Sequence, residues 1–142
     1  MIRILMVEDD AVQVELTRAQ SAQLKLRYEL DTAPTAEAAL KLLRGQAEAA
    51  PRPDLILVDL NLPGMTGSEL VDALAADPAL ATIPVVVVSA VEPSRAALIE
   101  LKKHARAWVE KPLSVEGWLK IVKAVPGLGL ALVKLPAAPS AT

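Results

Sequence analysis

The chain has 142 residues, a length that fits one domain with little left over for a second. Hydrophobic residues make up 53% and charged residues 23%, as in globular proteins, and the absence of cysteine excludes disulfides, zinc–thiolate sites and thiol nucleophiles. With a net charge of −2, only three aromatic residues, no apolar run of membrane-spanning length and no signal-peptide pattern, we expect a soluble cytoplasmic protein that binds neither nucleic acid nor a membrane.

The first half of the chain alternates between predicted strands and helices. Residues 2–7 form a continuous apolar run, which is typical of a strand buried on both faces, and residues 11–23 carry apolar side chains at helical spacing. A weaker strand is predicted at residues 27–31. The helix predicted next covers residues 36–44, and Gly45 is placed to end it.

The second half continues the same alternation and adds helix-start signals. Thr66 and Glu69 have the spacing of a capping box, Pro93 suits the first turn of a helix, and Ser114 can cap the last one. The strands and helices are predicted, in chain order, at residues 55–58, 66–76, 85–88, 93–104, 106–109 and 114–124.

Five alternations of strand and helix predict an α/β domain with a doubly wound, five-stranded parallel sheet and helices on both faces. The most common strand order for such a sheet is the flavodoxin-like order 2-1-3-4-5, with the ligand crevice at the carboxyl ends of strands 1 and 3. The composition changes after Val125. We therefore expect a domain over residues 1–125 and a C-terminal extension, an apolar arm with a Pro/Ala/Ser tail, over residues 126–142.

Acidic residues follow two of the predicted strands at the edge where the crevice is expected. Glu8, Asp9 and Asp10 follow the first strand, and Asp59 follows the third. Two carboxylates about 4 Å apart repel each other by roughly 4 kcal/mol at the effective dielectric of a partly exposed site, which favours a bound proton or cation. Oxygen ligands in an open crevice suit Mg²⁺.

The fourth and fifth strands add a hydroxyl and an ammonium group to this edge. Ser89 ends the fourth strand and Lys111 follows the fifth. A carboxylate, a divalent cation, a hydroxyl and an ammonium are the parts of a phosphoryl-transfer site in which the carboxylate is the nucleophile. Each residue alone has a simpler explanation, because acids cap helices, Asp59 suits a turn, hydroxyls bond to nearby backbone and lysines are solvated. Their coincidence at four strand ends favours the phosphoryl site.

These segments resemble, in order, the signature of the receiver domain of two-component response regulators. The resemblance runs from Ile2 to about Ala124, and its motifs are Val7-Glu8-Asp9-Asp10, Asp54 to Gly67, Val88-Ser89-Ala90 and Val109-Glu110-Lys111-Pro112. It implies that Asp59 accepts a phosphoryl group from a histidine kinase. It also implies that Mg²⁺ is held by Glu8, Asp9, Asp59 and the main-chain carbonyl of Asn61.

The resemblance also implies roles for the other strand ends. Ser89 and Lys111 would bind the phosphoryl oxygens, and the bond between Lys111 and Pro112 would be cis. Trp108 falls where many receivers carry a rotating Tyr or Phe, so the conformational switch would involve Ser89 and Trp108. Side chains beside the site, here Asn61 and Val91, would tune the lifetime of the acyl phosphate.

A finer resemblance concerns residues 51–67, 77–84 and 132–136, which are similar to single-domain regulators paired with bacterial phytochrome kinases. It implies a sensor histidine kinase as partner, a bacteriophytochrome among the candidates. It also implies a homodimer formed through the last strand, the last helix and the C-terminal arm. We therefore expect a stand-alone regulator without a DNA-binding output domain, which signals by protein–protein contact and shows only weak autodephosphorylation instead of enzymatic turnover.

Three other functions compete with this expectation. A phosphatase with an Asp nucleophile and Mg²⁺ resembles Asp-x-Asp, but its second acid is here Asn61, which cannot serve as a general acid. A flavin mononucleotide module needs a phosphate-binding loop after the first strand, where Glu8, Asp9 and Asp10 would repel the phosphate. A dimer that acts by docking alone would leave the complete set of Asp, Ser and Lys unexplained.

Overall fold

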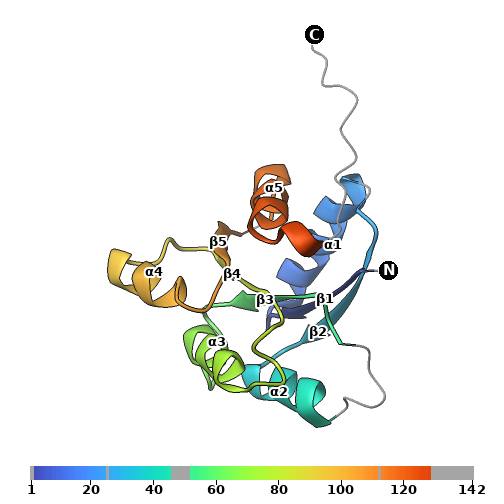
Figure 1. The fold of residues 1–142 in the computed structure, drawn as a ribbon. Coiled ribbons are helices and arrows are strands. Elements are labelled where there is room, and N and C mark those ends of the chain that lie inside the picture. Colours follow the sequence, from blue (N-terminus) through green and yellow to red (C-terminus); the bar gives the residue numbers. More distant parts are fainter. Residues whose placement is uncertain (1, 25, 46–51, 112, 129–142) are drawn as a thin grey trace.

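The computed structural model describes residues 2–24, 26–45, 52–111 and 113–128, and over these ranges strands and helices alternate along the chain (Figure 1). The elements are β1 (Ile2–Val7), α1 (Ala11–Gln23), β2 (Tyr28–Ala33), α2 (Ala36–Gly45), β3 (Leu55–Asp59), α3 (Gly67–Ala76), β4 (Val85–Ser89), α4 (Arg95–Leu101), β5 (Ala107–Glu110), α5 (Val115–Ala124) and the short 3₁₀ turn η1 (Pro126–Leu128). None of the helices in these ranges combines the length and the apolar composition needed to cross a membrane.

The strands form one parallel sheet in the order β2-β1-β3-β4-β5, which confirms the predicted topology. Helices α2 and α3 cover one face of the sheet, and α1 and α5 cover the other (Figure 1). Because the strands are parallel, the carboxyl ends of β1, β3, β4 and β5 meet at one edge. This edge carries the predicted site residues.

The two faces of the sheet explain the continuous apolar runs. Successive side chains of a strand point to opposite faces, so Leu5 and Val7 join the core under α2 and α3, while Ile4 and Met6 join the core beside α5. All four are at most 2% exposed. A strand in the middle of a covered sheet therefore needs apolar residues at every position, not at every second one.

Side-chain caps begin the helices where the sequence predicts them. Thr66 and Glu69 form the capping box of α3, and the Ser114 hydroxyl accepts a hydrogen bond from Gly117 at the start of α5. The prediction for α4 is wrong at both ends, since the helix begins after Ser94, which caps it, and ends at Leu101. Residues 102–104 form turns that lead back to β5.

The weak second strand is also displaced from its prediction. It covers Tyr28–Ala33 instead of residues 27–31, because its six residues pair with all six residues of β1. Pairing with a central strand outweighs the low strand propensity of Asp31 and Ala33 in this segment. At the other end of the chain, Leu128 is buried beside Val125. The arm beyond Leu128 and the predicted cis bond at Pro112 lie outside the described residues.

Candidate functional site

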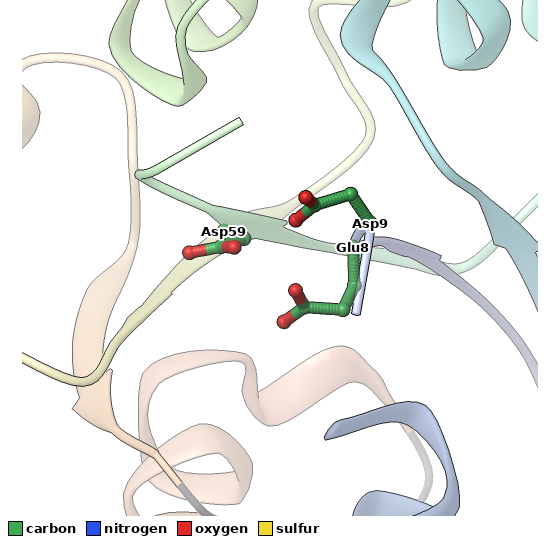
Figure 2. Close-up of side chains that lie close together, drawn as sticks. All are labelled: Glu8, Asp9 and Asp59. Carbon is green, nitrogen blue, oxygen red and sulfur yellow. The ribbon is translucent and has the colours of Figure 1, made fainter. Parts of the chain in front are cut away.

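Three carboxylates meet at the carboxyl ends of β1 and β3, as the sequence predicts. One carboxylate oxygen from each of Glu8, Asp9 and Asp59 lies within 4.8 Å of the other two. Glu8 and Asp59 are each 4% exposed, while Asp9 is exposed. Figure 2 shows the carboxyl groups of Glu8 and Asp9 extending from the end of β1 toward Asp59. The cluster is therefore buried at its base and open on the side of Asp9.

Asp10 is not part of this cluster. It has the simpler role that acidic residues before a helix can have, which is to cap the helix. Its Oδ1 accepts a hydrogen bond from the Val12 amide at 2.9 Å, so Asp10 caps α1. Its own amide donates to Glu8 Oε2 at 3.2 Å. Asp10 thus helps to orient a cluster residue without belonging to the cluster.

Lys111 lies between the two buried carboxylates. Its Nζ is 2.6 Å from Glu8 Oε1 and 3.1 Å from Asp59 Oδ2. The second oxygen of Asp59 accepts the Asn61 amide at 3.1 Å. The three side chains are between 1% and 9% exposed, so one ammonium group compensates two carboxylates that water barely reaches.

The pKa values reflect this excess of negative charge. Burial raises the pKa of Glu8, and the charge of Asp59 raises it further, while hydrogen bonds from Lys111 and from the Asp10 amide oppose the change. Burial alone would lower the pKa of the Lys111 ammonium, but its hydrogen bonds and ion pairs with Glu8 and Asp59 together raise it. Lys111 is therefore held in its charged form.

The donor set fits a small divalent cation. It consists of carboxylate oxygens, the ligand type that Mg²⁺ prefers, and three carboxylates face a single ammonium group. No hydrogen bond or ion pair of Asp9 occurs among the described residues, so its oxygens are free to bind an ion. Asn61 follows Asp59 by two residues, and the role of its carbonyl as a ligand stays a prediction.

Ser89 reaches the same edge from the end of β4, but its hydroxyl is engaged by the backbone. Its Oγ donates to the Val91 carbonyl at 2.7 Å and accepts the Val91 amide at 3.2 Å. Both bonds close a tight loop after β4. Ser89 would have to give up the bond it donates before it could donate to a ligand in the crevice.

Trp108 lies on β5, at an edge of the sheet. It is half-buried and packs against the core under α2 and α3, and Lys120 Nζ lies 5.1 Å from the centroid of its ring. Its indole Nε1 is buried without a hydrogen-bond partner among the described residues. The unpaired donor and the cation over the ring make the side chain sensitive to rearrangements of its neighbours.

Gly67 ends the sequence motif that begins at Asp54, but the motif does not predict the close contact that Gly67 makes with the backbone of Asp59. A Cβ at this position would overlap the carbonyl oxygen of Asp59 and lie 2.7 Å from Leu60 Cα. The Gly67 amide donates to the Leu60 carbonyl at 3.2 Å. The start of α3 thus packs directly on the backbone of Asp59, and only a residue without a side chain fits.

Comparisons with known proteins match the part of the chain that forms the sheet and carries these site residues. A family model described as the response regulator receiver domain matches residues 4–123. Response regulator Rcp1 of Synechocystis sp. is 31% identical over 137 residues, which are 95% of this chain and 93% of that protein. The chain therefore matches both the domain and the length of this relative.

Solved structures of related proteins share the fold. The bacteriophytochrome response regulator AtBRR has a TM-score of 0.77 and 26% sequence identity, over 96% of this chain and 99% of its own. The Mn²⁺-bound form of Rcp1 has a TM-score of 0.72 at 30% identity, over 96% and 100%. The phosphorylated cyanobacterial phytochrome response regulator RcpA has a TM-score of 0.72 at 31% identity, over 96% and 99%.

Proposed function

Since the chain belongs to the response regulator receiver domain family, we propose that it is a phosphorylation switch whose acceptor is Asp59. One observation carries the proposal: Asp59 is buried beside Glu8 and Asp9, with the Lys111 ammonium 3.1 Å from its carboxylate. A nucleophile, its counter-ion and a set of metal ligands would thereby lie together at one edge of the sheet, at the ends of β1, β3 and β5.

The arrangement assigns a part in phosphoryl transfer to each residue. An oxygen of Asp59 attacks phosphorus, the new O–P bond forms, and the bond between phosphorus and the histidine nitrogen of the kinase breaks. Mg²⁺ held by Glu8, Asp9, Asp59 and the Asn61 carbonyl would supply positive charge beside the phosphoryl oxygens. Lys111, already in contact with Asp59, supplies a second positive charge.

The proposed switch depends on the hydrogen bonds that the Ser89 hydroxyl makes with the backbone of Val91. A phosphoryl group on Asp59 brings new acceptor oxygens to the crevice, and the Ser89 hydroxyl can turn to them by giving up the Val91 carbonyl. This exchange pulls the loop after β4 and shifts the balance between two arrangements of α4, β5 and α5. A nearly complete change of population requires a differential free energy of roughly 5.5 kcal/mol.

Trp108 offers a direct test of the switch. With acetyl phosphate and Mg²⁺, we expect Trp fluorescence to change in the wild type, because the neighbours of Trp108 rearrange. Ser89→Ala should be phosphorylated with a smaller change, and Trp108→Phe should lose the signal although Trp118 remains. An unchanged emission in a wild-type protein that mass spectrometry shows to be phosphorylated would refute the switch.

The relatives support a phytochrome-type kinase as partner. AtBRR and RcpA are described as response regulators of bacterial and cyanobacterial phytochromes, the RcpA structure is phosphorylated, and the Rcp1 structure holds Mn²⁺. By similarity with them, we propose that a sensor histidine kinase of this kind phosphorylates Asp59. The regulator would then signal through protein contacts, without turnover of a free phosphate ester.

The surface of β5 and α5 supports the predicted homodimer. β5 is an edge strand, and Trp108, Glu110 and Lys120 line a hollow of about 160 Å³ beside it. On α5, Val115 and Leu119 are 39% and 41% exposed. A second copy could bury these side chains by the symmetric contact typical of dimers.

Truncation after Leu128 tests the contribution of the arm and keeps this buried residue in place. We expect light scattering to give twice the chain mass of 15.0 kDa for the full chain and the mass of a single chain for the truncated one. A truncated protein that still has twice the mass of its own chain would show that the arm is not required. A monomeric full chain would rule out the dimer itself.

A further inference from the structure

The segment between β3 and α3, residues 60–66, carries Asn61 two residues after Asp59, and different contacts hold its start, middle and end. At its start, the Leu60 amide donates to the Val88 carbonyl and the Asn61 amide to Asp59. At its end, Thr66 forms the capping box of α3. Residues 63–65 lie between these two anchors; Pro63 and Gly64 are exposed, and the Met65 side chain is partly buried against the core.

One hydrogen bond joins this middle part to another element, as far as the described residues go. The Met65 amide donates to Glu37 Oε2 at 3.1 Å. Pro63 has no amide hydrogen to donate. The bond connects positions 28 residues apart and crosses from the first turn of α2 to the segment after β3.

Gly64 brings its backbone close to the same carboxylate. Its φ of +73° turns the chain in the left-handed region, and a Cβ at this position would lie 3.1 Å from Glu37 Oε2. The Glu37 carboxylate therefore lies against the backbone of residues 64 and 65. The absence of a side chain at Gly64 leaves room for it.

The base of this contact is rigid. Helix α2 is fixed on the sheet by Ala36, Ala39, Leu40 and Leu43, which are at most 9% exposed. The Thr35 hydroxyl accepts the Ala38 amide at 3.0 Å and holds the first turn. Glu37 is exposed, and no other hydrogen bond or ion pair of its side chain occurs in the described part of the chain. A charged acceptor on a fixed helix thus adds a hydrogen bond to a segment whose side-chain contacts with the core come from Leu62 and Met65.

We propose that Glu37 is a positioning residue, which sets the segment after Asp59 so that the Asn61 carbonyl faces the metal site. The inference rests on the proposed function, because it assumes that this carbonyl is a ligand. Without the anchor, residues 63–65 gain conformational freedom, and the ligand must be ordered each time an ion binds. The cost of this ordering appears as a weaker affinity for the cation.

Binding of Mn²⁺, followed by electron paramagnetic resonance, tests the proposal without any phosphodonor. We expect Glu37→Ala to bind Mn²⁺ about fivefold more weakly than the wild type, as for the loss of one hydrogen bond. Glu37→Gln keeps an acceptor oxygen and should stay close to the wild type. Glu15→Ala removes the same charge from an exposed position on α1, where the side chain is 76% exposed, and should also bind normally.

Amide exchange of Met65 and thermal unfolding complete the test. Exchange should be faster in Glu37→Ala and unchanged in Glu15→Ala, and all variants should unfold within a few degrees of the wild type. Normal Mn²⁺ affinity in Glu37→Ala, or unchanged exchange at Met65, would overturn the positioning role. A wild type that binds no Mn²⁺ would instead contradict the proposed function, so the two failures can be told apart.

Discussion

Gly67→Ala should destabilise the protein by about 3 kcal/mol, although it adds only one methyl group. The added Cβ would overlap the Asp59 carbonyl oxygen and lie 2.7 Å from Leu60 Cα and 2.9 Å from the Asp59 carbonyl carbon. All three are backbone atoms, so no flexible side chain can move aside. The start of α3 must shift away from β3, and the hydrogen bond from the Gly67 amide to the Leu60 carbonyl is lost.

Urea unfolding measures this effect, with Gly45→Ala as the matched control. Gly45 ends α2, and a Cβ there would meet no atom within 4 Å, so this variant should stay within about 0.5 kcal/mol of the wild type. Equal stability of Gly67→Ala and the wild type would show that α3 does not pack on the backbone of Asp59 as described.

Lys111→Met should cost about 3 kcal/mol of stability in the absence of divalent cations. The variant keeps most of the side-chain volume but leaves Glu8 and Asp59 buried side by side without a counter-ion. Addition of Mg²⁺ should restore part of the loss, because a bound cation stabilises the folded state and replaces the missing charge. Urea unfolding in EDTA and in Mg²⁺ measures both effects.

The pH dependence of this variant has a definite sign. A raised pKa means that the folded protein binds more protons than the unfolded chain, so stability falls as pH rises above the ordinary Glu value of 4.5. Without Lys111, Glu8 loses the hydrogen bond that opposes the rise of its pKa. The loss of stability in Lys111→Met relative to the wild type should therefore become smaller toward acidic pH.

Lys103→Met is the matched control for Lys111→Met. Its ammonium also lies 3.1 Å from a carboxylate, that of Glu100, but the two side chains are 58% and 71% exposed. An ion pair in water contributes less than about 1 kcal/mol. A similar small loss for Lys111→Met would contradict the description of a buried, charge-compensated site.

The sequence predicts the sheet and its active edge because both depend on local patterns. Continuous aliphatic runs such as residues 85–88 are typical of strands buried on both faces of a parallel sheet. The strand order then brings Glu8 and Asp59 together from positions 51 residues apart. Helix starts with a capping side chain, such as Thr66, are also local. The displaced start of α4 has a different cause, because Pro93 and Ser94 are adjacent start signals and it is Ser94 that caps the helix.

Contacts between distant residues could not be predicted from these patterns. Nothing in the spacing says that Lys111 reaches Glu8 as well as Asp59, since this depends on the length of the Glu side chain and on the final packing. The same holds for Glu37 and the Met65 amide, and for Gly67, the first residue of α3, against the backbone of Asp59. Asp10 and Asp9 are adjacent and chemically identical, yet only the helix start decides which one caps α1.

The most direct test of the account is the intact mass of the protein after incubation with acetyl phosphate. We predict a gain of one phosphoryl group in the wild type with Mg²⁺, no gain in EDTA, and no gain in Asp59→Asn under either condition. A phosphoryl group retained on Asp59→Asn, or equal labelling with and without Mg²⁺, would contradict the assignment of Asp59 and of its metal-dependent site.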